Sequence, residues 1–178
     1  KVIRREFRLI EGDAFSTAKL RLSRQRIRNL GFFEKVEMTN VPGTTADSTV
    51  VNVTVQEKST GEISFGAGFS SSSGILGDIT LRERNLIGKG QDLNLRLSVG
   101  QRQQQVHLSF TEPYFLTRNI SAGFDVFRNT QDLQAESSFD RERLGGKLRA
   151  GYRINESLIQ NWFISGREDT VTDIDEGA

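Results

Sequence analysis

Polar and apolar residues alternate along most of the chain after residue 60. In residues 91–100, for example, Leu93, Leu95, Leu97 and Val99 are separated by polar side chains. Because successive side chains of a β-strand point to opposite faces, this period of two predicts a strand with one apolar wall. The same alternation predicts seven antiparallel strands, at residues 62–70, 76–84, 91–100, 104–112, 120–128, 145–154 and 158–166.

The two faces of these strands differ in polarity. One face is apolar, with candidates Ile63, Phe65, Ala67, Phe69, Ile120, Ala122, Phe124, Val126, Leu148, Ala150 and Tyr152. The opposite face collects Arg82, Arg84, Arg96, His107, Asp125, Lys147, Arg149 and Arg153. Such a sheet is either half-buried in a soluble protein or forms the wall of a membrane barrel with a wet interior. The alternation alone does not choose between them.

The first 31 residues have helical spacing instead. Ile3, Phe7 and Ile10 are spaced for one helix that ends at Gly12. Ser16 is a candidate N-cap for a second helix, and Gly31 lies where a left-handed C-terminal cap is expected. The second helix has an apolar face (Leu20, Ser23, Ile27, Leu30) and basic residues elsewhere (Lys19, Arg21, Arg24, Arg26, Arg28). We interpret the basic residues as a solvated surface in preference to an anion site.

Two further strands are predicted at residues 32–41 and 49–57, on either side of a polar loop. Two helices and two strands make a partial α+β module over residues 1–58, which precedes the strand-rich residues 59–178. A lone two-stranded ribbon is marginally stable in water, so we expect a further strand upstream of Lys1. The chain also starts without Met and without a leader pattern, and we interpret it as part of a longer protein.

Composition narrows the classes of function. The 178 residues include 24 Lys and Arg against 23 Asp and Glu, so charge gives no general argument for nucleic-acid binding. The absence of Cys excludes disulfides and Cys-bound zinc. A mean hydropathy of -0.44 and the lack of a long apolar run exclude a membrane helix, but they do not exclude a membrane barrel.

Loop lengths and aromatic placement favour the barrel. Links at one end of the strands are short, whereas residues 129–144 predict a long charged loop at the other end, as is typical of outer-membrane barrels. Phe110, Tyr114, Phe115, Trp162 and Phe163 could anchor at a membrane interface, although ordinary sheet packing accounts for them as well. Seven strands do not close a bacterial barrel, so further strands are expected.

Motifs for catalysis and for metal or cofactor binding are missing. Gly66-Ala67-Gly68 precedes no helical pattern, which argues against a dinucleotide site. His107 is the single histidine and has no second His or Cys for a metal, so we interpret it as a polar residue facing the barrel interior. The acidic residues are scattered, with no pair placed for acid–base chemistry. We therefore predict no enzyme activity, no cofactor and no metal.

Several motifs resemble a known family. Leu30-Gly31-Phe32-Phe33-Glu34-Lys35-Val36 resembles the helix-to-strand signature of a POTRA (polypeptide-transport-associated) module. Residues 57–61 resemble the junction into a barrel, and residues 64–70, 83–90 and 112–115 are similar to the opening strands of outer-membrane assembly factors. This resemblance to the superfamily that joins POTRA modules to a transmembrane β-barrel covers residues 1–130 well and the remainder poorly.

The resemblance implies a bacterial outer-membrane protein whose POTRA part lies in the periplasm. It implies a central component of the machinery that folds and inserts outer-membrane proteins, with unfolded client proteins, accessory lipoproteins and outer-membrane lipid as partners and no nucleic acid. It also implies a lateral seam where the first barrel strand meets the last. The strand at that seam comprises Gly61, Glu62, Ile63, Ser64, Phe65, Gly66, Ala67, Gly68, Phe69 and Ser70.

Glycine in this first strand gives little side-chain packing, so we expect a weakly held edge that can pair with client strands. Tight barrel curvature is an equal explanation for the glycines. Arg82, Arg96, His107 and Arg149 are expected to face the barrel lumen. Two other functions stay open: a POTRA-barrel transporter that secretes a passenger through its pore, and a soluble β-rich binding module.

Overall fold

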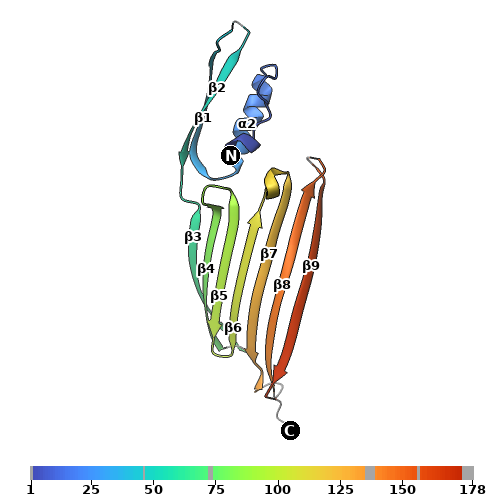
Figure 1. Cartoon of the computed structure of the whole chain (residues 1–178). Helices are drawn as coiled ribbons and strands as arrows, with labels where there is room; N and C mark the ends of the chain where they lie inside the picture. Colours follow the sequence, from blue (N-terminus) through green and yellow to red (C-terminus); the bar gives the residue numbers. More distant parts are fainter. Residues whose placement is uncertain (1, 46, 72–73, 135–138, 156, 174–178) are drawn as a thin grey trace. The chain divides into compact units, whose positions relative to one another are not determined.

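The computed structural model describes residues 2–45, 47–71, 74–134, 139–155 and 157–173 (Figure 1). The chain divides into two compact units, residues 1–60 and residues 61–178. The first unit contains α1 (Val2–Arg5), α2 (Thr17–Asn29), β1 (Phe33–Pro42) and β2 (Thr49–Glu57). The second contains seven strands and one short 3₁₀ helix. No helix within the described ranges is long and apolar enough to cross a membrane.

Helix α2 begins and ends at the residues that the sequence predicts. The Ser16 hydroxyl accepts a hydrogen bond from the backbone N–H of Lys19 at 3.3 Å, which satisfies one of the free donors of the first turn. At the other end, Gly31 has a φ of +72°, and its N–H donates to the carbonyl of Arg28 at 3.0 Å. Glycine adopts this left-handed conformation without a Cβ penalty, so both predicted caps are confirmed.

The core of the first unit lies between α2 and the β1–β2 hairpin. Ile27 is fully buried, Val36 is 2% exposed and Phe32 is 7% exposed. The hairpin register places Val36 opposite Val55, so the apolar side of β2 continues the face that α2 covers on β1. Burial of these aliphatic and aromatic side chains is the main favourable term for a unit of this size.

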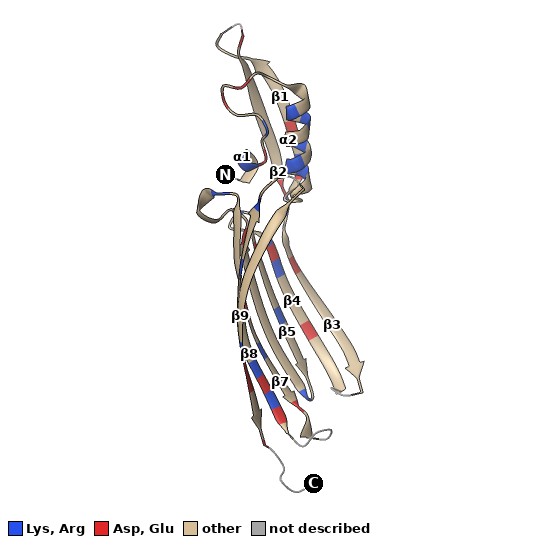
Figure 2. Ribbon diagram, turned by 90° about the vertical axis from the view of Figure 1, so that its right-hand side faces the viewer, with Lys and Arg blue, Asp and Glu red and all other residues tan. Residues whose placement is uncertain are grey.

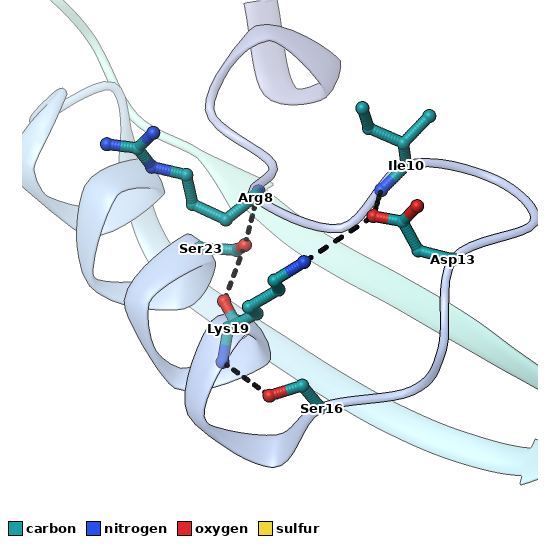
Figure 3. A network of polar contacts seen from close by, with 6 residues as sticks. All are labelled: Arg8, Ile10, Asp13, Ser16, Lys19 and Ser23. Atoms are coloured by element: carbon teal, nitrogen blue, oxygen red, sulfur yellow. Dashed lines mark hydrogen bonds and ion pairs between the residues drawn. The ribbon is translucent and has the colours of Figure 1, made fainter. Parts of the chain in front are cut away.

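The first predicted helix is wrong beyond residue 5. Residues 7–12 leave the helical path because their backbone groups bond elsewhere (Figure 3). The backbone N–H of Arg8 donates to the hydroxyl of Ser23 at 2.9 Å, and that hydroxyl donates to the carbonyl of Lys19 at 2.8 Å. Ile10, predicted on the apolar side of the helix, is 74% exposed.

The second unit is a single layer of antiparallel strands in chain order. Every strand pairs with the strand before or after it in the sequence, and Figure 1 shows them side by side. Their bounds are β3 (Gly61–Ser70), β4 (Gly74–Leu86), β5 (Gln91–Gly100), β6 (Gln103–Glu112), β7 (Ile120–Asp132), β8 (Asp140–Arg153) and β9 (Ile159–Thr172).

The long loop predicted at residues 129–144 is mostly strand. Strand β7 continues to Asp132 and β8 begins at Asp140, and these two residues are paired in register. The charged run Asp140-Arg141-Glu142-Arg143 therefore belongs to β8. Residues 135–138 of the predicted loop lie outside the described residues. The bounds of the described strands therefore do not reproduce the predicted difference in loop length between the two ends of the sheet.

Two predicted turn motifs have clear local causes. After β4, the Asn85 side-chain oxygen accepts the N–H of Gly90 at 2.8 Å, while Gly88 and Gly90 have φ values of +66° and +74°. Strand β6 ends at Glu112, as the following proline predicts. The Glu112 carboxylate accepts the N–H of Tyr114 at 2.9 Å and the side-chain amide of Gln91 at 2.7 Å, which joins this turn to β5.

Candidate functional site

Strand β3 forms one edge of the seven-stranded sheet (Figure 1). It pairs with β4 in unbroken antiparallel register, from Gly61 opposite Glu83 to Ser70 opposite Gly74. In the described part of the chain, no strand pairs with the other side of β3. An edge strand of this kind presents backbone N–H and C=O groups to which an incoming strand can bind.

The glycines of β3 are not required by contacts within the sheet. Gly61, Gly66 and Gly68 lack a positive φ. A Cβ at Gly68 would meet no described heavy atom within 4 Å, and a Cβ at Gly66 would meet Asp78 Cβ at an ordinary 3.5 Å. At Gly61 the nearest atom, at 3.0 Å, is the end of the flexible Glu83 side chain. Packing within the described sheet thus leaves room for a Cβ at Gly66 and Gly68.

One face of the sheet carries contiguous apolar rows. Cross-strand register aligns Phe65, Ile79, Leu97 and Val106 in one row, and Ile63, Leu81, Leu95, Leu108 and Val126 in the next. Phe65 is 77% exposed and Phe69 is 80% exposed, because no described element packs over this face at β3. A continuous exposed apolar surface of this extent is typical of a surface that contacts lipid or another protein.

The opposite face carries the four residues predicted to line a lumen. Register and alternation place Arg82, Arg96, His107 and Arg149 together on it. Arg96 and His107 are directly opposite each other on β5 and β6. Basic and acidic positions occur on several strands of the sheet (Figure 2). They alternate along the start of β8. The assignment of this face to a barrel lumen stays a prediction.

Arg149 connects three strands on the polar face. Its Nε lies 2.8 Å from Oδ2 of Asp125 on β7, and its Nη2 donates to Oδ1 of the same carboxylate at 3.2 Å. The same Nη2 also donates to the hydroxyls of Ser109 at 3.0 Å and Thr111 at 3.1 Å, both on β6. A planar guanidinium with donors on several nitrogens is suited to such a contact set.

Gly123 provides the space through which Arg149 reaches β6. In register, Gly123 on β7 lies between Thr111 on β6 and Arg149 on β8. A Cβ at this position would approach the backbone oxygen of Phe110 at 2.6 Å and Nη2 of Arg149 at 3.2 Å. Alternation predicts that Arg149 and Asp125 share one face. It does not predict the approach of Ser109, Thr111 and Gly123, because their proximity follows from strand register.

Arg82 makes a simpler and more exposed contact. Its Nη2 lies 2.9 Å from Oδ2 of Asp92 on β5, and the two side chains are 47% and 36% exposed. Among the residues that the structure describes, no group of His, Cys, Asp or Glu is arranged to hold a metal ion. The polar face therefore offers cross-strand ion pairs and hydrogen bonds. The apolar face and the two edge strands of the described sheet, β3 and β9, are open to other molecules.

Two family models match the chain, one in each of its two units. Residues 1–58 match the POTRA family model, described as a surface antigen variable number repeat. Residues 85–178, more than half of the chain, match the family model described as the Omp85 superfamily domain. The chain belongs to the Omp85 superfamily.

Relatives of this Omp85 chain include two outer membrane protein assembly factors. BamA of Neisseria meningitidis serogroup B is 32% identical over 161 residues, which cover 90% of this chain and 20% of that protein. BamA of Nitratidesulfovibrio vulgaris is 30% identical over 179 residues, which cover 99% of this chain and 22% of that protein. The chain thus spans about a fifth of the length of these curated relatives.

Solved structures extend the similarity to the fold. The crystal structure of BamA from Haemophilus ducreyi lacking POTRA domains 1–3 aligns with a TM-score of 0.82 at 29% identity, covering 97% of this Omp85 chain and 33% of that chain. CdiB from Acinetobacter baumannii aligns with a TM-score of 0.59 at 16% identity, and so it shares the fold.

These matches confirm the predicted resemblance and the order of a POTRA part followed by barrel-type strands. At the level of the family they also confirm an outer-membrane location with a periplasmic POTRA part. The relatives are named as assembly factors and not as enzymes, in agreement with the predicted lack of enzyme activity.

Proposed function

We propose that this chain is part of a factor that folds and inserts outer-membrane β-barrel proteins. The observation that supports this function is the similarity to BamA along the whole chain, which includes both the POTRA part and the sheet. The unfolded outer-membrane proteins are then the clients. Accessory assembly lipoproteins would bind the POTRA part, and outer-membrane lipid would contact the apolar face of the sheet.

Strand β3 is the element proposed to act on the client. Its outer edge offers backbone groups for β-augmentation, in which a client strand binds as the next strand of the sheet. Gly66 and Gly68 lower the stability of any strand pairing at this edge without being needed for packing. Ile63, Phe65 and Phe69 lie on the exposed apolar face and would contact lipid while the backbone templates the client.

Disulfide crosslinking in intact membranes tests this function. Cysteines are introduced singly at Ser64 and Gly66 of β3, and a client with cysteines along its last strand is stalled during assembly. The matched control is Ser98→Cys on β5, since Ser98 is paired on both sides, with Asp78 and Gln105. We expect crosslinks from β3 and none from position 98. Absence of client crosslinks along all of β3 would refute the templating role.

A second variant tests the part assigned to the glycines. Gly68→Val fits the described structure, because a Cβ there meets no described atom within 4 Å. It raises strand propensity by up to about 1 kcal/mol. If a weakly held edge is important for exchange with the client, insertion slows by up to about fivefold while the β3–β4 pairing is kept. If the glycines serve curvature alone, the variant changes barrel stability and leaves client crosslinking at Ser64 unaltered.

Secretion of a passenger through the pore has weaker support. The relatives described above are named for assembly of outer-membrane proteins. The same crosslinking experiment distinguishes the two functions, because a secreted passenger would contact the polar face at Arg82, Arg96 and Arg149 and not the edge of β3. A soluble binding module is not supported by membership of the Omp85 superfamily.

A further inference from the structure

Helix α2 carries a stripe of three arginines without carboxylate partners. Arg21, Arg24 and Arg28 lie at positions i, i+3 and i+7, which brings them to one side of the helix. All three are exposed. Among the residues that the structure describes, no ion pair or hydrogen bond joins their side chains to another residue. Figure 2 shows the basic positions along α2. We call these three residues the arginine stripe.

The other basic residues of α2 are used inside the unit. Arg26 Nε lies 3.0 Å from Oε2 of Glu6, whose side chain is 12% exposed. Lys19 Nζ lies 3.5 Å from Oδ2 of Asp13 (Figure 3). The basic face that the sequence predicts as one solvated surface is therefore two sets of residues. One set holds the segment before α2 in place, and the arginine stripe remains available.

We propose that the arginine stripe binds the phosphate groups of anionic phospholipids at the membrane surface. The guanidinium group donates two parallel hydrogen bonds to a phosphate, and each arginine adds about 1 kcal/mol of attraction to an anionic surface. Strand β2 ends at Glu57 and β3 begins at Gly61. The three intervening residues span at most about 10 Å, so a membrane-embedded sheet would tether the first unit by a short link.

The surroundings of the stripe favour lipid over a protein partner. Thr17 and Gln25 occupy the same side of α2, and both are polar, so the stripe lacks the buried aromatic centre of a protein–protein hot spot. A row of phosphates needs no pocket and matches a flat line of cations. The proposal requires the membrane location of the sheet but not the insertion activity.

Fluorescence quenching in nanodiscs tests the proposal. The whole protein, with Gln25→Cys as its sole cysteine and a fluorophore attached there, is placed in discs of phosphatidylcholine alone or mixed with phosphatidylglycerol. Both kinds of disc contain a headgroup-labelled quencher lipid. We expect strong quenching in the anionic discs, weak quenching in the neutral ones, and loss of quenching at about 0.5 M salt, where charges are screened within a few ångströms.

Two triple variants separate the stripe from net charge. R21Q/R24Q/R28Q should lower the ratio of docked to undocked α2 about fivefold per arginine, or on the order of a hundredfold in total. R4Q/K35Q/K58Q removes the same net charge elsewhere in the first unit and should leave the quenching unchanged. R21K/R24K/R28K keeps the positive charge and should retain most of the quenching.

Three outcomes would overturn the proposal. These are equal quenching in neutral and anionic discs, equal loss in the two glutamine variants, and docking of α2 that requires added accessory proteins. Client insertion is measured on the same discs. Loss of client insertion activity in the unmodified protein with quenching intact would count against the proposed function alone.

Discussion

Removing the Arg149 side chain should destabilise the sheet more than removing any similar exposed ion pair on the same face. Arg149→Met keeps the length of the side chain and deletes its contacts with Asp125, Ser109 and Thr111. The Asp125 side chain is 16% exposed and would be left without its cation. Hydrogen bonds to charged groups contribute about 1.5–3 kcal/mol each, and partial exposure of Arg149 reduces this. We therefore expect a loss of about 2 kcal/mol.

Arg82→Met is the matched control. It deletes one arginine–aspartate pair between neighbouring strands of the same face, but the two side chains are 47% and 36% exposed. Exposed ion pairs contribute about 0.2–1 kcal/mol, so this variant should lose less than about 1 kcal/mol. The comparison holds the chemistry constant and changes burial and the number of partners.

Equilibrium urea unfolding of the whole protein in detergent micelles gives the free energies, provided that the m-value is unchanged. Arg149→Met, Asp125→Asn and the double variant complete a double-mutant cycle, and we expect a coupling energy of at least about 1 kcal/mol. A coupling energy near zero, or an Arg149→Met loss no larger than that of Arg82→Met, would refute the claim that Arg149 joins β6, β7 and β8.

Two further substitutions test close contacts. Gly145→Ala would place its Cβ 2.5 Å from the Phe127 ring and 3.0 Å from the backbone oxygen of Gly166. We expect the free energy of unfolding to fall by about 1–3 kcal/mol in the same urea assay, and Phe127→Leu to restore part of it. No loss of stability would contradict the packing of that ring over Gly145. Ser23→Ala should lower the stability of the first unit by about 1–3 kcal/mol, because the backbone N–H of Arg8 loses its acceptor at the fully buried Ser23. Hydrogen exchange at the Arg8 amide should accelerate. Unchanged protection of that amide would count against the contact.

Strand bounds are predictable from the sequence where one face is apolar and the other polar. Strands β2 and β5 have the predicted bounds, since polar and apolar residues alternate along most of β2 and all of β5. Strand β7 ends at Asp132, beyond its predicted end at residue 128, and β8 begins at Asp140, before its predicted start at residue 145. Most residues in these extensions are polar on both faces, so the hydrophobic period disappears while the backbone pairing persists. Arg128 Nε lies 2.7 Å from Oε1 of Glu142 across this polar extension.

The early end of the first helix and the partners of Arg149 depend on contacts between distant parts of the chain, which the local sequence pattern does not predict. The spacing of Ile3, Phe7 and Ile10 fits a helix, but Ser23 of α2 takes the backbone N–H of Arg8 as a partner and the segment leaves the helical path. Alternation predicts β3 as a strand, whereas its position at a seam is inferred from the family resemblance. The partners of Arg149 could not be predicted, because they are 24 to 40 residues away in sequence and their proximity depends on register.

Each strand of the sheet pairs with its neighbour in the chain, and this order has a consequence for folding. The contact order within the sheet is low for a β-protein, because each hairpin closes over a short loop. The strands can therefore be added one at a time, each pairing with a neighbour that is already in the sheet. At each stage the newest strand is itself an edge that accepts the next, so the growing sheet repeats on its own chain the step proposed for the client.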